Sequence, residues 1–251
     1  MPRAVFRLDT RATVFLSLAA LFVSALLIGD IIGSKLFDVT FFGKTWTLSA
    51  GIIPFPMTFV LTDVLNEFYG KRAARTVTWV GFAMAVFAFT IITISVYLPW
   101  HAGTLDPEWK GVTQGSFDAV FRGGQRILLA SMVAYLLSQF LDIWVFDLLK
   151  RTTSGRFIWL RATGSTLVSQ LIDTAVIQTG VWVGIQTLPA LLELIATSYL
   201  VKIGVAVGLT PVVYAAHAVV QRVLKLEPLK PGAEADAQPE SSAAVTHPPR
   251  S

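Results

Sequence analysis

The sequence predicts an all-α fold: a polytopic inner-membrane protein with six transmembrane helices. Of the 251 residues, 54% are hydrophobic and 14% are charged, whereas a soluble domain carries about 25% charged residues. The mean hydropathy is +0.63, and the 17 Phe and 7 Trp residues suit the two interfaces of a bilayer. Because the chain has no Cys, a disulfide framework and any cysteine-ligated metal site are excluded.

Six apolar stretches are the expected helices, since about 20 mostly apolar residues cross the hydrocarbon core. In chain order they occupy residues 12–29, 49–70, 76–100, 127–149, 162–192 and 194–221. The first stretch follows three Arg residues, as a signal peptide would, but no cleavage motif follows it and further spans come after it. We therefore expect it to remain in place as the first helix.

Basic residues are distributed unequally between the two sides that these spans define. The side with both termini and the second and fourth loops holds 14 Lys and Arg residues, and the opposite side holds five. Because Lys and Arg concentrate in cytoplasmic loops, both termini are expected in the cytoplasm. The same loops account for the net charge of +4, so the basic balance does not indicate a nucleic-acid partner.

Three segments are not expected to span the bilayer. Residues 36–48 alternate around Phe42-Gly43-Lys44 and predict a short outer hairpin. Residues 99–124 predict a polar outer loop. The last residues are rich in Pro, Ala, Ser and Glu and have no core to bury. We therefore expect a transmembrane domain over residues 1–226 and a disordered cytoplasmic tail over 227–251.

The second predicted helix has one polar half, and an ionisable residue at membrane depth is costly enough to suggest function. Five residues form this half: Thr58, Thr62, Asp63, Asn66 and Glu67. Asp63 and Glu67 are one turn apart, so both can face a cavity. Alternatively, Glu67 lies near the headgroups and pairs with Lys71.

A short polar pattern occurs twice, 31 residues apart. Ser138-Gln139-x-x-Asp142 recurs as Ser169-Gln170-x-x-Asp173. Repeated polar patches on transporter helices often meet at a central substrate site. The competing interpretation is that these side chains bond one helix to another.

Lys202 interrupts the last apolar stretch and needs a carboxylate partner or a lowered pKa at membrane depth. Asp173 and Asp63 are the candidates. A structural ion pair and a contact with a ligand both remain open.

Motifs of catalysis are absent from the chain. G-x-G-D, G-x-S-x-G and H-E-x-x-H do not occur, and residues 29–35 depart from the phosphate-binding loop in length and order. Three scattered His residues do not indicate a catalytic zinc or a haem. The sequence predicts a transporter or a membrane subunit, without enzymatic activity, cofactor or metal.

The polar half of the second helix resembles the motif of the queuosine precursor transporter family, also called the vitamin uptake transporter family. The residues that carry the resemblance are Gly51, Phe55, Pro56, Thr58, Phe59, Thr62, Asp63, Glu67, Tyr69 and Gly70. The two polar repeats and Lys202 with Thr210-Pro211-x-x-Tyr214 also look like later motifs of this family, in the same order. The resemblance covers roughly residues 26–225.

The resemblance implies import of queuosine precursors, 7-deazaguanine bases such as 7-cyano-7-deazaguanine, for tRNA modification. It also implies a six-helix fold similar to the substrate-binding components of energy-coupling factor importers. The expected substrate-binding residues are Asp63, Asn66, Glu67, Gln139, Asp142, Gln170, Asp173 and Lys202. Among them, Glu67 and Asp173 are expected to recognise the base directly. Aromatic walls are available from Phe55, Phe59, Tyr135 and Phe146.

The expected partners are the lipid bilayer and a small purine-like molecule, with a homo-oligomer or an energising module as further candidates. A stand-alone transporter is the first hypothesis. The alternative is a substrate-binding subunit of an ATP-driven vitamin importer, and a structural subunit of another membrane complex is the weakest.

Overall fold

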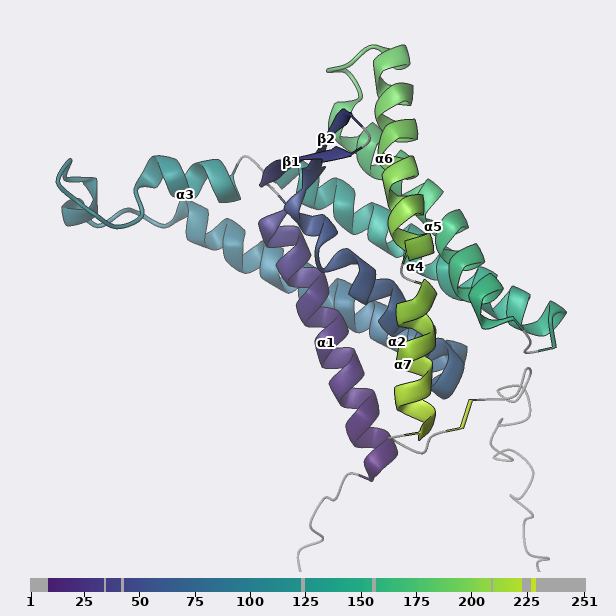
Figure 1. The fold of residues 1–251 in the computed structure, drawn as a ribbon. Helices are drawn as coiled ribbons and strands as arrows, with labels where there is room; N and C mark the ends of the chain where they lie inside the picture. Colours follow the sequence, from purple (N-terminus) through teal and green to yellow (C-terminus); the bar gives the residue numbers. More distant parts are fainter. Residues whose placement is uncertain are drawn as a thin grey trace, which may run out of the picture.

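The computed structural model describes residues 9–228, apart from 34, 42, 123–124, 155–156, 209 and 223–226. The described chain is mainly helical, as predicted, and Figure 1 shows helices that cross one another with a small sheet at one end. Its elements are α1 (Thr10–Ile32), β1 (Leu36–Phe41), β2 (Lys44–Ser49), η1 (Ala50–Ile52), α2 (Phe55–Tyr97), η2 (Ala102–Leu105), α3 (Gln114–Phe121), α4 (Gln125–Thr152), α5 (Ile158–Trp182), α6 (Leu188–Gly208) and α7 (Thr210–Arg222). The predicted tail lies almost entirely outside the described residues.

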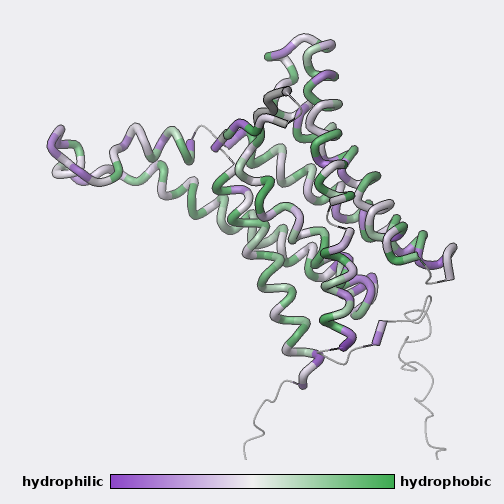
Figure 2. The backbone as a smooth tube through the Cα atoms, in the orientation of Figure 1, coloured by the Kyte–Doolittle hydropathy of each residue, from purple (hydrophilic) through white to green (hydrophobic). Residues whose placement is uncertain are grey.

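Four stretches of the described chain are long and apolar enough to cross a membrane. They are Thr10–Ile32, Ala50–Tyr97, Gln114–Thr152 and Leu188–Gly208, and Figure 2 shows hydrophobic residues along all of them. Large apolar side chains such as Phe87 and Leu200 are 60% exposed on these helices, which suits contact with lipid. These stretches support a helical membrane protein, and the count of six spans stays a prediction.

The helix α2 is broken at Gly70 into two halves that match the second and third predicted spans. Gly70 has φ 86° and ψ 171°, a conformation that glycine adopts without steric cost. In Figure 1 the second half of α2 leads away from the first half and toward α3. Residues 71–75 were expected to form a loop and are helical instead, because one glycine is enough to reverse the direction.

The boundaries of the last two predicted spans are wrong. The helix α5 ends at Trp182 and α6 begins at Leu188, whereas the fifth span was expected to continue to residue 192. Gly184, with φ 78°, turns the chain, and Pro189 stands in the first turn of α6, where a missing N–H is harmless. Hydropathy alone does not detect such a turn, because the residues around it are apolar.

The predicted hairpin is confirmed by β1 and β2, and its location on the outer side stays a prediction. The two strands pair antiparallel from Leu36 opposite Ser49 to Phe41 opposite Lys44, and Gly43 has φ 73° in the tight connection. The predicted outer loop contains a short helix, α3, which Thr113 caps at its N-terminus.

The core of the bundle lies where α1 and α4 pack on α2. Phe22 of α1 and Tyr135 of α4 are buried there, with ring centroids 6.4 Å apart. Gly81 of α2 permits this close packing, because a Cβ at that position would lie 2.7 Å from the Tyr135 hydroxyl and 3.0 Å from the Phe22 ring. Tyr135 also donates a hydrogen bond to the Thr78 carbonyl at 3.0 Å. This packing positions the polar face of α4 toward α5.

Candidate functional site

A narrow cleft opens between α2, α5, α6 and α7, and one carboxylate lies in its wall. Phe55, Phe59 and Asp63 of α2 face Thr163 and Thr166 of α5, and the cleft has about 20 Å³ of space that a water-sized molecule can enter. The centroids of the Phe55 and Phe59 rings lie 4.8 Å apart, and the ring planes are tilted relative to each other. Of the expected aromatic walls, these two line the cleft.

Asp63 is buried without a hydrogen-bond partner for Oδ1 among the described residues. Electrostatic interactions connect it to Asp142, Glu67 and Arg161. The sequence favoured a cavity role for Asp63, and its position in the cleft agrees with that interpretation. A buried polar atom without a partner is costly, so Asp63 Oδ1 suits a donor that is supplied from outside the chain.

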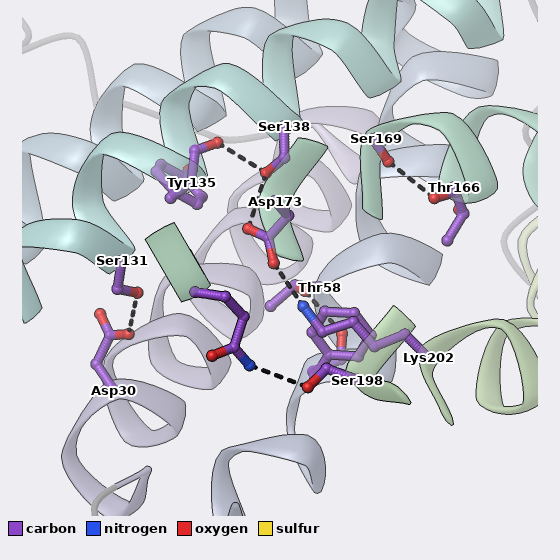
Figure 3. A network of polar contacts seen from close by, with 12 residues as sticks. Asp30, Thr58, Ser131, Tyr135, Ser138, Thr166, Ser169, Asp173, Ser198 and Lys202 are labelled. Atoms are coloured by element: carbon purple, nitrogen blue, oxygen red, sulfur yellow. Dashed lines mark hydrogen bonds and ion pairs between the residues drawn. The ribbon is translucent and has the colours of Figure 1, made fainter. Parts of the chain in front are cut away.

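The two polar repeats meet across α4 and α5 through reciprocal hydrogen bonds. Ser138 of the first copy donates to Asp173 Oδ1 of the second at 3.3 Å, and Ser169 of the second donates to Asp142 Oδ1 of the first at 3.1 Å. Figure 3 shows the bond between Ser138 and Asp173. These bonds join α4 to α5, as the second interpretation expects, and a role of the repeats in substrate binding stays a prediction.

The remaining groups of the two repeats differ in their partners. Gln139 accepts a hydrogen bond from the Thr62 hydroxyl at 3.3 Å. In contrast, the Gln170 amide and Asp142 Oδ2 have no hydrogen-bond partner in the described part of the chain, and both residues are buried. Gln170 lies one helical turn after Thr166, which lines the cleft.

Lys202 has the carboxylate partner that its depth requires. Its Nζ lies 2.6 Å from Asp173 Oδ2 and 5.1 Å from the centroid of the Phe55 ring, and the ion pair is visible in Figure 3. Of the two candidate partners, the structure selects Asp173. Phe55 lines the cleft as well, so this ion pair stands beside the cleft.

Glu67 belongs to a buried cluster of charges, which we call the Glu67 cluster, with Lys150 and Arg161. Lys150 Nζ lies 3.1 Å from Glu67 Oε2 and Arg161 Nη2 lies 3.3 Å from Glu67 Oε1. The alternative in which Glu67 pairs with Lys71 is wrong, because Lys71 instead forms a 3.1 Å ion pair with Asp147.

Lys150 and Arg161 are the site residues that the sequence analysis missed, because both were counted as loop charges. Each continues a row of polar or aromatic residues at spacing i, i+4, which places it on the inner face of its helix. The row of α4 is Asp142, Phe146 and Lys150, and the row of α5 is Arg161, Ser165 and Ser169. These rows are the signal that was available in the sequence.

Asn66, the remaining expected site residue, bonds α2 to α4. Its Nδ2 donates to the Ile143 carbonyl at 3.4 Å, and its side chain is buried. About three turns away on the same helix α4, Ser131 donates to Asp30 of α1 at 3.1 Å, also shown in Figure 3. These two polar contacts thus join α2 and α1 to α4.

Paired and unpaired charges around a cleft in the interior of a helical membrane protein are typical of transporters. Residues 49–216 match the family model described as "Putative vitamin uptake transporter". The chain belongs to this family, and the family is one of transporters, not of enzymes.

Three curated relatives bear names of the same kind. The chain is 35% identical over 181 residues to the "Probable queuosine precursor transporter" of Bacillus subtilis (strain 168), which covers 71% of this chain and 74% of the relative. It is 30% identical over 133 residues to the "Queuosine precursor transporter" of Escherichia coli (strain K12), covering 53% of this chain and 52% of that one. The Haemophilus influenzae relative is 29% identical over 136 residues, covering 54% and 50%. No solved structure matches the chain, so the expected likeness to energy-coupling factor components stays a prediction.

Proposed function

We propose that this protein imports queuosine precursors, 7-deazaguanine bases such as 7-cyano-7-deazaguanine, across the inner membrane for tRNA modification. The observation that carries the proposal is a set of buried groups without partners among the described residues: Asp63 Oδ1, Asp142 Oδ2 and the Gln170 amide. They belong to α2, α4 and α5, and of the three residues Asp63 lines the cleft, together with the rings of Phe55 and Phe59. The names of the relatives support this substrate class.

These groups match the chemistry of a guanine-like base. Its ring N–H and exocyclic amine are adjacent donors, which the free carboxylate oxygens of Asp63 and Asp142 can accept. Its carbonyl suits the Gln170 amide, which both donates and accepts, and its flat ring suits Phe55 and Phe59. An adenine lacks the adjacent pair of donors and is expected to bind weakly.

The proposal assigns the eight expected site residues to two roles. Asp63, Asp142 and Gln170 contact the base. The other five already have partners within the protein and hold the helices around it: Asn66, Glu67, Gln139, Asp173 and Lys202. This division changes the expectation that Glu67 and Asp173 recognise the base directly.

Six spans with both termini in the cytoplasm are part of the proposal. The 48 residues of Ala50–Tyr97 rise about 72 Å at 1.5 Å per residue, more than twice the ~30 Å of a hydrocarbon core, and Gly70 divides them. The other spans would be α1, α4, α5 and α6 with α7. Arg11 donates to the Phe68 carbonyl, and the Phe68 ring packs against His217 of α7. These contacts support an arrangement in which the ends with the excess of basic residues share one side.

Uptake of labelled 7-cyano-7-deazaguanine into proteoliposomes that contain this protein alone tests the proposal. Asp63→Asn and Asp142→Asn should each lower the affinity about 5- to 150-fold, because an amide N–H would face a donor of the base in a desolvated contact. Asp147→Asn is the matched control, since Asp147 is paired with Lys71 and Arg151 outside the cleft. Its affinity should equal that of wild type.

The alternative function gives a different result in the same experiment. A substrate-binding subunit of an ATP-driven importer would bind the base but would not transport it until an energising module is added. A protein that neither binds nor transports the base, or one whose affinity is equal in Asp63→Asn and wild type, would contradict the proposal.

A further inference from the structure

Arg161 is a buried guanidinium that uses only part of its hydrogen-bonding capacity. It stands in the first turn of α5 and is 1% exposed. Its Nη2 contacts Glu67 Oε1 at 3.3 Å, while Nε and Nη1 have no partner among the described residues. An arginine offers five N–H donors in a fixed fork, so this side chain can serve a second acceptor.

Asp63 is an acceptor that lacks a donor, whereas Arg161 has donors that lack an acceptor. It precedes Glu67 by one turn on α2, its Oδ1 has no partner in the described chain, and Arg161 attracts it electrostatically. Asp142 and Glu67 act on it with the opposite sign. Two carboxylates on one face of α2 therefore compete for one guanidinium.

Lys150 makes an exchange of partners feasible. Its Nζ contacts Glu67 Oε2 at 3.1 Å and the Glu67 backbone carbonyl at 3.3 Å. Glu67 thus keeps a cation if Arg161 leaves it, whereas Asp63 forms no ion pair among the described residues, and Arg161 is a cation that acts on it. An unpaired charge in a low-dielectric interior is costly. If the Arg161 guanidinium moved from Glu67 to Asp63, one turn along α2, it would neutralise Asp63 and remove that cost.

We propose that Arg161 is the exchangeable counterion of Asp63 in the transport cycle. In the arrangement seen here Glu67 holds Arg161, and Asp63 is free to accept the donors of the base. After release of the base, Arg161 pairs with Asp63, so that the unloaded carrier changes conformation without an isolated carboxylate. This inference rests on the proposed function, because it requires that Asp63 contact the base.

Net uptake and exchange separate this role from a structural one. Net uptake requires return of the unloaded carrier, whereas counterflow exchange uses only the loaded carrier. In Arg161→Gln, net uptake should fall about tenfold or more while exchange stays within about twofold of wild type. Arg161→Lys keeps the charge and should retain most of the net uptake. Arg151→Gln, at a half-exposed ion pair, is the matched control and should leave both rates unchanged.

Glu67 provides a second and independent test, because the proposal makes it a competitor for Arg161. Glu67→Gln should release Arg161 to Asp63 and weaken binding of the base about tenfold, although Glu67 does not contact the base. The same change in an Arg161→Gln background should have no further effect on affinity. Equal losses of exchange and net uptake in Arg161→Gln, or unchanged affinity in Glu67→Gln, would overturn the inference.

A ligand-free measurement distinguishes failure of this inference from failure of the proposed function. If the wild-type protein neither binds nor exchanges the base, the proposed function is wrong. The pairing itself is then tested by thermal unfolding of Asp63→Asn, Arg161→Gln and the double variant. Non-additive shifts in Tm would support an Asp63–Arg161 interaction, and strictly additive shifts would exclude it.

Discussion

The two polar repeats have the same side chains at the same spacing, yet the structure gives them different partners. In the first copy, on α4, Gln139 is bonded to Thr62, while Asp142 Oδ2 has no hydrogen-bond partner among the described residues. In the second copy, on α5, Asp173 is paired with Lys202 while the Gln170 amide is free of partners in the described chain. Each copy thus has one group tied to a third helix and one group left open.

The difference comes from the neighbours and not from the repeat itself. The helix α2 brings Thr62 to the first copy and α6 brings Lys202 to the second. The reciprocal bonds of Ser138 and Ser169 are nearly equal in length, at 3.3 and 3.1 Å, so the serines of both copies have the same role. The comparison teaches that a repeated motif can supply equivalent contacts between its copies and unlike groups to a ligand.

The largest effect on stability is expected when the contact between the second copy and α6 is removed. Lys202→Met removes the cation from Asp173 and should lower the free energy of unfolding by about 3 kcal/mol, the low end for a broken buried pair, because both side chains keep some exposure. Thermal unfolding in detergent measures the loss. The double variant Lys202→Met/Asp173→Asn should recover part of it. If the free energy of unfolding falls by less than an exposed ion pair contributes, Lys202 is not needed for stability.

A smaller effect of opposite sign should distinguish the two glutamines. Gln170→Met replaces two unsatisfied polar atoms by an apolar chain of similar shape, and should raise the free energy of unfolding by about 1 kcal/mol while weakening binding of the base. Gln139→Met leaves the Thr62 contact unmade and should lower the free energy of unfolding by a similar amount. Unfolding and binding are measured on both variants. Equal behaviour of the two would contradict the asymmetry between the copies.

The last effect, of similar size, concerns the feature that the copies share. Ser138→Ala and Ser169→Ala should each lower the free energy of unfolding by about 1 kcal/mol, the net value of one hydrogen bond, and the two losses should be alike. Ser95→Ala, whose hydroxyl bonds within its own helix, is the control and should change stability less. Clearly unequal losses at Ser138 and Ser169 would show that the two helices are not joined symmetrically.

Features that depend on neighbours in sequence could be predicted. Apolar stretches located most of the helices, and alternation around Phe42-Gly43-Lys44 located the hairpin. The polar half of the second helix contains Asp63, which lies in the cleft. Lys202 required a carboxylate, and one of its two candidates, Asp173, is its partner. Each of these conclusions uses local periodicity or the cost of a charge in lipid.

Features that depend on contacts between distant segments could not be predicted. Lys150 and Arg161 were assigned to a loop, and the structure buries them against Glu67. The turn between α5 and α6 was placed too late, since the residues on either side are equally apolar.

The sequence by itself determined that this chain is a helical membrane protein with charges in its interior, because hydropathy and the cost of a buried charge are properties of each segment alone. Only the tertiary structure decided which charges neutralise one another. Glu67 receives its cations from α4 and α5, more than 80 positions away in the chain, while Asp63, one turn earlier, remains open to the cleft. Spacing along one helix places both carboxylates on the same face, and only the packing of the other helices against that face makes them different.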